Sequence, residues 1–522
     1  MQACAPLPVQ PPVQPFSAAA TNFAELVDHL ESAEARKMTH SELERELEER
    51  GRELMRLLLQ DHLNTRGPGE ASEPVIDSEG EKRTTQRLHK RGLATVFGKV
   101  EVHRLGYGVA GADSLHPLDG ELNLPRELYS HGLRRRAAEE VAKGSYDEAV
   151  ATLTRYTGSA VPKRQVEELV VRAAQDFDAF YQQTSAAPEA SESLLVMSFD
   201  GKGVVMRHED LRPATRKAAA KRQHKLSKRL SKGEKRNAKR MATVAAVYTV
   251  APFVRTPEQV VGTLAPIHGV APQKRPRPED KRVWASLQKE PEQVIEQAFE
   301  EAIRRDPGRT KSWVALVDGE PNQLRLLQRI QKRHGIELTI VLDLIHVTEY
   351  LWKAAFVFCA EATKELEDWV SVRLLKVLQG RASDVAAGIR RSATKRGLNP
   401  AQREAADTAA NYLLHYAAYL HYHQYLAAGL PIATGVIEGA CRHLVKDRMD
   451  LTGARWSLAG AEAVLRLRAL RSSGDFDDYW GFHEAQEHQR NHAAFYAPPK
   501  VPATRKPQTR SPNRQLRLVK PL

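Results

Sequence analysis

The sequence predicts a mixed α/β domain combined with all-α regions. Two observations point to this class. Between residues 189 and 352, short apolar runs typical of buried strands alternate with amphipathic helical patterns, as in "SWVALVDGE" followed by "NQLRLLQRIQKRH". On both sides of that segment, hydrophobic residues recur mostly with helical spacing.

Composition narrows the class of partner. Lys and Arg total 78 against 65 Asp and Glu, and the formal charge of +13 favours polyanions, chiefly nucleic acid. Three cysteines without CxxC spacing predict neither a disulfide framework nor a cysteine-based zinc finger. The chain lacks a secretory signal, a long apolar run and a GxxxxGK[ST] motif. We therefore expect a cytoplasmic protein, nucleoid-associated when bound to DNA, without a membrane segment or a nucleotide cofactor.

The two ends of the chain are predicted to be disordered. Residues 1–20 are rich in Pro, Gln and Ala, and residues 496–522 form a basic tail. Residues 21–90 are predicted to be a helical region, because their apolar residues recur with helical spacing up to the "RGPGEASEP" stretch.

Residues 91–188 combine a small predicted β hairpin with a helix-turn-helix-like pair. In the pair, Gly158 breaks the first helix and Pro162 opens the second. An ordinary helical hairpin would give the same pattern. If the pair does bind DNA, the residues on the first turn of its second helix are the contacts: Lys163, Arg164 and Gln165.

The predicted α/β region, residues 189–352, contains a very basic segment at 212–240, with thirteen Lys or Arg and one Glu. Such a run can be a solvated loop or helix. Its density of one charge favours an element that contacts phosphates and orders only on DNA. The side chains proposed for this role are Lys221, Arg222, Lys225, Lys228 and Arg229.

Three acids are the candidates for chemistry. Two apolar strands are followed by the same dipeptide, "VMSFDG" at Asp200 and "VALVDG" at Asp318, where an α/β sheet opens its ligand crevice. Glu438 lies at the start of a mostly apolar helix and alone would be a simple helix-dipole partner. Together the three form a hard-oxygen set suited to Mg²⁺ or Mn²⁺.

These stretches resemble one known family. "FDGKGV", "ALVDGEPNQ", "LDLIHVTEYLWKAA" and "PIATGVIEGACRHLVKDRMDLTGARWSLAGAEAVLRLRAL" are similar to blocks of the DDE transposases of bacterial insertion sequences, in the Mutator-like branch with the ISKra-type elements. The resemblance implies an RNase H-like catalytic core in which Asp200, Asp318 and Glu438 bind two divalent ions, Mg²⁺ or Mn²⁺. It also implies that residues 353–430 are an all-α insertion and that residues 431–495 are the final core helices.

Asp343 and His346 match a spacing of this branch, in which a Cys or Asp and then a His follow the second catalytic acid. The pair could point into the crevice, with His346 bonding a phosphate or orienting a carboxylate. Asp343 could instead cap the helix that begins beside it. A third possibility is that Asp343, not Asp318, is the second catalytic acid.

Several residues around Glu438 are candidate DNA contacts. Trp456 could stack on an unpaired base, and it could equally be a core anchor. The basic residues that suit backbone contacts are Arg442, Lys446, Arg448 and Arg455, although surface solvation would explain each of them.

The function that follows is that of an insertion-sequence transposase. We expect it to bind terminal inverted repeats and target DNA as a dimer or higher oligomer, and to cleave and join strands with the acidic triad. Two alternatives remain at this point: a structure-selective nuclease on the same core, and a domesticated DNA-binding protein without catalysis.

Overall fold

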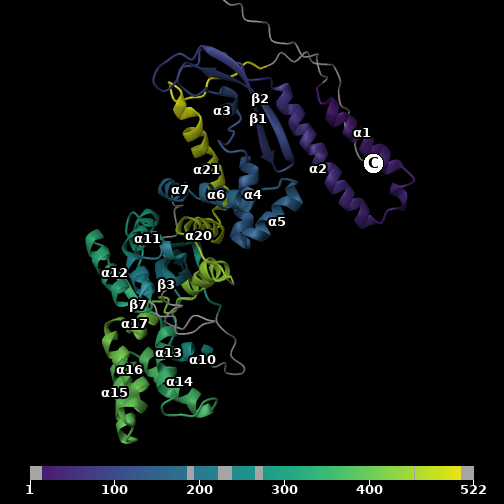
Figure 1. The fold of residues 1–522 in the computed structure, drawn as a ribbon. Coiled ribbons are helices and arrows are strands. Elements are labelled where there is room, and N and C mark those ends of the chain that lie inside the picture. The colour runs from purple at the N-terminus through teal and green to yellow at the C-terminus, as the bar shows by residue number, and fades with distance from the viewer. Residues whose placement is uncertain (1–14, 185–192, 222–237, 265–273, 452, 507–522) are drawn as a thin grey trace, which may run out of the picture. The chain divides into compact units, whose positions relative to one another are not determined.

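The structure, a computed structural model, describes residues 15–184, 193–221, 238–264, 274–451 and 453–506 (Figure 1). The chain forms two compact units. The first contains the residues up to Asp176 together with those from Asp478 onward, and the second runs from Phe177 to Asp477. We expected residues 431–495 to be the final helices of one core. The division differs from this, because the part from Asp478 onward belongs to the first unit.

The first unit combines a two-stranded antiparallel sheet with helices. Its strands are β1 (Thr85–Thr95) and β2 (Gly98–Gly108), paired from Thr85–Gly108 to Thr95–Gly98. Its helices are α1 (Ser17–Glu31), α2 (His40–Thr65), α3 (Pro117–Glu121), α4 (His131–Lys143), α5 (Tyr146–Thr157), α6 (Lys163–Ala173) and most of α21 (Phe476–Asn491). Leu59 and Leu63 of α2 pack on a buried cluster from the hairpin and the α3 region.

Helices α4, α5 and α6 pack against one another, so the predicted helix-turn-helix pair has a third helix beside it. Ser145 and Glu148 form a capping box at the start of α5, and Gly158 ends the helix with a left-handed φ of 64°. Val166 and Val170 of α6 are fully buried, which fixes the helix face that carries them.

Both predicted disordered ends are partly wrong. Helix α1 begins at Ser17, inside the segment expected to be disordered to residue 20. At the other end, Tyr496 and Thr504 form bridges with Asp77 and Ala71, so residues 496–506 add short pairings to the first unit. Residues 1–14 and 507–522 lie outside the described residues.

The second unit is built on a five-stranded mixed sheet in the order β5-β4-β3-β6-β7. Adjacent strands among β5, β4 and β3 are antiparallel, whereas β6 is parallel to β3 and β7 is parallel to β6. The strands are β3 (Leu194–Val205), β4 (Lys239–Val250), β5 (Glu279–Ser286), β6 (Trp313–Val317) and β7 (Leu338–Leu342). This arrangement confirms a mixed α/β fold that is mostly helical.

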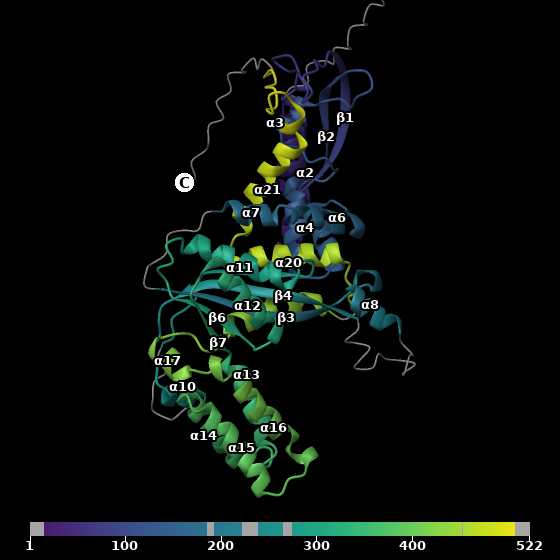
Figure 2. The same cartoon turned by 90° about the vertical axis from the view of Figure 1, so that its left-hand side faces the viewer.

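Helices cover the sheet. Its strands are apolar on both faces, as in β3, where Leu195, Met197 and Phe199 alternate with Val196 and all four are at most 1% exposed. Helix α11 packs on β4 and β3, and α20 packs on β5 (Figure 2). The helices of this unit are α7 (Phe177–Gln183), α8 (Pro213–Ala220), α10 (Pro257–Leu264), α11 (Pro291–Arg305), α12 (Pro321–His334), α13 (Leu344–Ala355), α14 (Lys364–Leu378), α15 (Ala382–Lys395), α16 (Pro400–His415), α17 (Tyr422–Ala427), α18 (Gly435–Ala440), α19 (Asp447–Met449) and α20 (Leu458–Ser473).

Helices α13 to α17 lie beyond the β7 edge of the sheet (Figures 1 and 2). Tyr422 of α17 donates its hydroxyl to the carbonyl of Leu342, the last residue of β7, at 2.7 Å. This bond attaches the returning end of the helical segment to the sheet. Within the described residues, none of the helices is both long and apolar enough to cross a membrane.

Candidate active site

Asp200 and Asp318 have matching positions on neighbouring parallel strands. The β3–β6 ladder ends at the pair Ser198–Leu316; Asp200 follows two residues later within β3, and Asp318 follows two residues later, directly after the end of β6. Parallel neighbours lie about 4.8 Å apart, so the backbone at Asp200 lies beside the turn that carries Asp318. The prediction that Asp200 ends its strand is wrong, since β3 continues to Val205 along β4.

The turn after β6 is held by the helical segment. Gly319 has a φ of +91°, and an added Cβ would lie 2.9 Å from a methyl carbon of Leu342, so the position requires glycine. Tyr416, the residue after α16, donates to the carbonyl of Gly319 at 2.6 Å, and Tyr412 of α16 donates to that of Asp318 at 3.3 Å. These two tyrosines of the helical segment therefore fix the backbone that carries Asp318.

Glu438 lies in the first turn of α18, which packs against β3 and β4, and its side chain is exposed. Three residues later, Cys441 donates its thiol hydrogen to Oδ2 of Asp200, with 3.0 Å between Sγ and oxygen. Burial raises the pKa of Cys441, and the charges of Asp200 and Glu438 raise it further, so the thiol stays protonated. Cys441 thus joins the segment of Glu438 to the strand of Asp200.

A π-helix, residues Cys441–Lys446, follows α18 directly. Such segments are rare and are frequently found at functional sites. The wider helical turn leaves carbonyl groups for other partners, and Arg468 of α20 donates to the carbonyls of His443 and Leu444. The π-helix is therefore attached to α20 as well as to β3.

Asp343 is buried and caps α13. Its Oδ1 accepts the backbone N–H of Ile345 at 3.0 Å, and its Oδ2 accepts the hydroxyl of Thr434, the residue before α18. Burial raises the pKa of Asp343, although the hydrogen bonds from Thr434 and Ile345 act in the opposite direction. Of the three interpretations of Asp343, the structure shows the cap, and the cap also fixes the start of the helix that carries Glu438.

His346 lies in the first turn of α13 with 41% of its side chain exposed. Its Nδ1 is 3.7 Å from Oε2 of Glu349 on the same helix. The charge of His346 also acts on Asp343, but the described contacts give it no bond to Asp200, Asp318 or Glu438. A role in contacting phosphate stays a prediction.

Two predicted DNA contacts are wrong because their side chains are buried. Trp456 is 6% exposed, its indole donates to the carbonyl of Met449 at 3.2 Å, and its backbone pairs with β3 next to Met206. Arg448 is 2% exposed, with its guanidinium carbon 4.7 Å from the centre of the Trp456 ring. Trp456 is therefore the core anchor that one of its two interpretations described.

The other candidate contacts that the structure describes are at the surface. Those near Glu438 are exposed: Arg442, Lys446 and Arg455. On α6, Nζ of Lys163 bonds Asp147 at 2.8 Å, while Arg164 and Gln165 reach Glu168 at 3.4 and 3.2 Å. Lys221 is exposed at the end of α8. The remaining predicted contacts lie outside the described residues: Arg222, Lys225, Lys228 and Arg229.

Sequence reasoning missed four residues that hold the site: Cys441, Thr434, Tyr412 and Tyr416. A signal existed for Cys441, since it follows Glu438 by three residues and therefore lies on the same helix face. Nothing local marks the other three, because each acts on a residue at least 91 positions away.

The donor set of Asp200, Asp318 and Glu438 fits Mg²⁺ or Mn²⁺ in chemistry, because all three donors are carboxylates. Its spacing fits less well. In the described part of the chain, no three His, Cys, Asp or Glu side chains are grouped closely enough to hold a metal ion. Glu438 lies close enough to Cys441, the hydrogen-bond donor to Asp200, for its charge to raise the pKa of that thiol.

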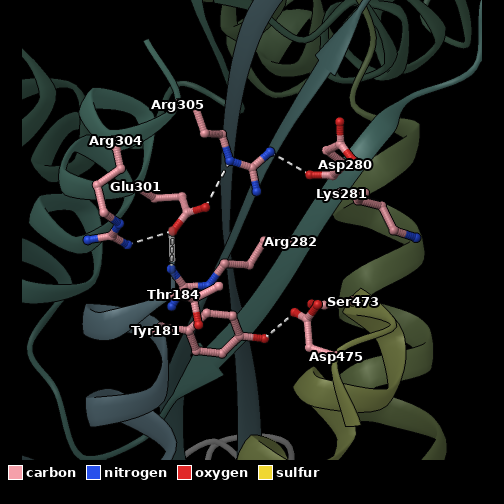
Figure 3. A pocket seen from close by; sticks show the side chains of 10 residues that line it. All are labelled: Tyr181, Thr184, Asp280, Lys281, Arg282, Glu301, Arg304, Arg305, Ser473 and Asp475. Carbon is pink, nitrogen blue, oxygen red and sulfur yellow. Dashed lines mark hydrogen bonds and ion pairs between the residues drawn. The ribbon is translucent and has the colours of Figure 1, made fainter. Parts of the chain in front are cut away.

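A second concentration of charge lies in the same unit, beside β5. Glu301 of α11 receives hydrogen bonds from Arg282, Arg304 and Arg305 around a cavity of about 180 Å³ (Figure 3). Burial would raise the pKa of Glu301, but the charges of Arg282 and Arg305 lower it to about 2. The carboxylate bonds Arg282 of β5 as well as Arg304 and Arg305 of α11, so this cluster attaches α11 to β5.

Comparison with known proteins gives no match, either to a protein-family model or to the sequence of a curated protein.

Proposed function

We propose that this protein is an insertion-sequence transposase that cleaves and joins DNA strands with Asp200, Asp318 and Glu438. The observation that carries the proposal is the placement of the two aspartates. Asp200 lies on the first strand of the five-stranded sheet in chain order, and Asp318 directly follows the fourth, its parallel neighbour. An RNase H-like core requires this arrangement, and the sequence resemblance predicts it.

The placement of Glu438 gives partial support. Its helix packs on the strand of Asp200, and Cys441 bonds that strand one turn later. Because the three acids are not grouped closely enough to hold a metal ion in the described part of the chain, the proposal includes a rearrangement that brings them together when ions and DNA bind. The hydrogen bond from Thr434 to Asp343 holds in place the residue that precedes α18, the helix of Glu438.

The reaction would need charge compensation that carboxylates alone do not provide. Two divalent ions bound by the three acids would supply the activation of a water or 3′-hydroxyl and the stabilisation of the leaving oxygen. The chain's own residues position the donors: Tyr412 and Tyr416 hold the turn of Asp318, and Cys441 orients Asp200. Phosphate contacts would come from exposed cations near Glu438, such as Arg442 and Lys446.

The test is an assay with duplexes that carry the inverted repeats flanking the gene, a target plasmid and Mg²⁺. Wild type is compared with Asp200→Asn, which removes one charge at nearly constant shape, and with Glu209→Gln, which removes an exposed charge elsewhere in the same unit. We expect joined products from wild type and Glu209→Gln and none from Asp200→Asn, with equal melting temperatures showing that all three fold.

The alternatives predict different products. Nicked DNA without joined product, again lost in Asp200→Asn, would replace the transposase with a structure-selective nuclease. Binding of the repeats without any cleavage by wild type would indicate a DNA-binding protein without catalysis. Joined products that persist in Asp200→Asn would refute the assignment of the acids.

A further inference from the structure

A larger cavity, of about 620 Å³, lies within the first unit. Strands β1 and β2, the segment around α3 and the end of α21 form its walls. Cavities of this size are typical of sites for small molecules. The sequence analysis assigned no residue in this cavity to a function.

The charge of the cavity is positive. Four arginines line it, against two aspartates: Arg83, Arg91, Arg104, Arg126, Asp113 and Asp119. Arg83 is paired with Asp77 outside the wall. Arg91 and Arg104 share one buried carboxylate, that of Asp119, and Arg91 is also within reach of the charge of Glu127.

Burial first, and then neighbouring positive charge, lowers the pKa of two groups that line the cavity. Burial, and then the charge of Arg91, lowers the pKa of Arg104 to about 10. Burial, followed by the charges of Arg104, His89 and Arg91, lowers the pKa of His116 to about 3. Among the described residues, Nε of Arg104 and Oδ1 of Asp119 also have no hydrogen-bond partner. An anion in the cavity would relieve this repulsion.

The rest of the wall is made of rings and amide groups. Nδ1 of His89 and Nε2 of His116 are 2.8 Å apart, and both imidazoles line the cavity. Phe495, 39% exposed, and the buried Tyr496 close the side formed by the segment after α21. Exposed aromatic faces suit the stacking of a base. The combination of cations with rings favours a phosphate group that carries a heteroaromatic base.

We propose that this cavity binds one nucleotide, with its phosphate held by Arg126 and Arg104 and its base against Phe495. The nucleotide could be free or could belong to a DNA strand. We favour the strand, and that choice alone rests on the proposed function. Arg126 is exposed at the rim, where a strand could deliver a phosphate without entering the cavity completely.

The test measures binding of dTMP, thymidine, inorganic phosphate and the single strand dT5 to the full-length protein by calorimetry. The variants are Arg126→Glu and, as a matched control on α2, Arg45→Glu, which makes the same charge change at an exposed position outside the cavity. Phe495→Ala tests the ring. We expect dTMP to bind, thymidine to bind about tenfold more weakly, and Arg126→Glu to weaken dTMP by about tenfold, because an arginine–phosphate bond is charge-assisted.

The outcomes separate the sources. If dT5 binds more tightly than dTMP and depends on Arg126, the ligand is a nucleotide of a strand; tight dTMP with weak dT5 indicates a free nucleotide. If inorganic phosphate binds as tightly as dTMP, and Phe495→Ala leaves both affinities unchanged, the base makes no contact and the proposal of a nucleotide is wrong. No dTMP binding, or equal loss in Arg126→Glu and Arg45→Glu, would overturn the site. Asp200→Asn should bind dTMP as tightly as wild type, because Asp200 is outside the cavity. A failure of the cleavage assay can therefore be told apart from a failure of the nucleotide site.

Discussion

The thiol of Cys441 donates a hydrogen bond to Oδ2 of Asp200, with 3.0 Å between the two atoms. The bond occupies a carboxylate oxygen that a divalent ion would also use. It therefore sets the state of Asp200 before any ion arrives. Its removal should change ion affinity without touching a carboxylate.

We expect Cys441→Ala to bind Mn²⁺ about fivefold more tightly than wild type, because the competing hydrogen bond is worth about 1 kcal/mol. Cys441→Ser keeps a donor and should not gain affinity. Cys359→Ala, at the other described cysteine, is the matched control. Titration calorimetry with Mn²⁺ measures all four proteins. Unchanged or weaker binding in Cys441→Ala would contradict the competition.

Stability should depend on pH through Asp343. Its pKa is raised in the folded state, so the folded protein takes up this proton more readily than the unfolded chain. The contribution of Asp343 is then fully present below the ordinary value of 3.8 and is lost as pH rises through the raised pKa. In urea unfolding, the advantage of wild type over Asp343→Asn should shrink with rising pH in that window. A difference constant with pH would exclude this titration.

Gly319→Ala should destabilise the second unit by about 1–3 kcal/mol, since it forces a side chain into a left-handed conformation. Gly388→Ala, inside α15 with nothing within 4 Å of the added carbon, is the matched control. It should stabilise by about 0.5–1 kcal/mol, because alanine favours a helix interior. Thermal unfolding followed by circular dichroism compares the two signs. Equal effects would refute the strain at Gly319.

Arg134 is fully buried and pairs with Glu127 and Glu487 in the first unit. Arg134→Met leaves both carboxylates without this cation and should cost about 3–5 kcal/mol in urea unfolding. Arg172→Met removes another partner of Glu127, but Arg172 is 46% exposed, so its loss should stay within about 1 kcal/mol. Similar losses in both variants would mean that burial does not decide the contribution.

The helix-turn-helix interpretation is tested by Arg164, whose side chain is 88% exposed on the first turn of α6. If it contacts a phosphate, Arg164→Gln should reduce the slope of log affinity against log salt by about 1. Arg45→Gln on α2 should leave the slope unchanged. Fluorescence anisotropy with repeat-containing duplexes at several salt concentrations measures both. An unchanged slope for Arg164→Gln would favour the ordinary helical hairpin.

The sequence predicted those strands whose burial dominates their composition. The first half of β3 and almost all of β6 and β7 are apolar, and these strands appear where the apolar runs placed them, although β3 continues past Asp200 to Val205. Residues 85–92 of β1 are mostly polar because their side chains are mostly exposed, so the hairpin, which the alternating apolar and polar residues of 93–107 predict, begins earlier than predicted. The pairing of residues 71–77 with 496–504 depends on contacts between distant segments, which no local pattern encodes.

The site shows the same limit. The acids were identifiable because a carboxylate after an apolar strand is unusual. The burial of Arg448 could not be predicted, because nothing in the sequence distinguishes an arginine that stacks on a buried ring from one that is solvated. Asp343 followed its cap pattern, yet its second bond, to Thr434, joins residues 91 positions apart.

The hydrogen bond between Thr434 and Asp343 also has a consequence for which parts of the chain can vary in evolution. The chain leaves the sheet at Asp343 and comes back to the same spot at Thr434, so the excursion between them begins and ends at one hydrogen bond. The cost of closing a loop rises only slowly with its length. The distal helices α14 and α15 could therefore be lengthened, shortened or replaced while the carboxylates keep their positions. Tyr412 and Tyr416, at the end of α16, could not be lost in the same way, because they hold the turn of Asp318.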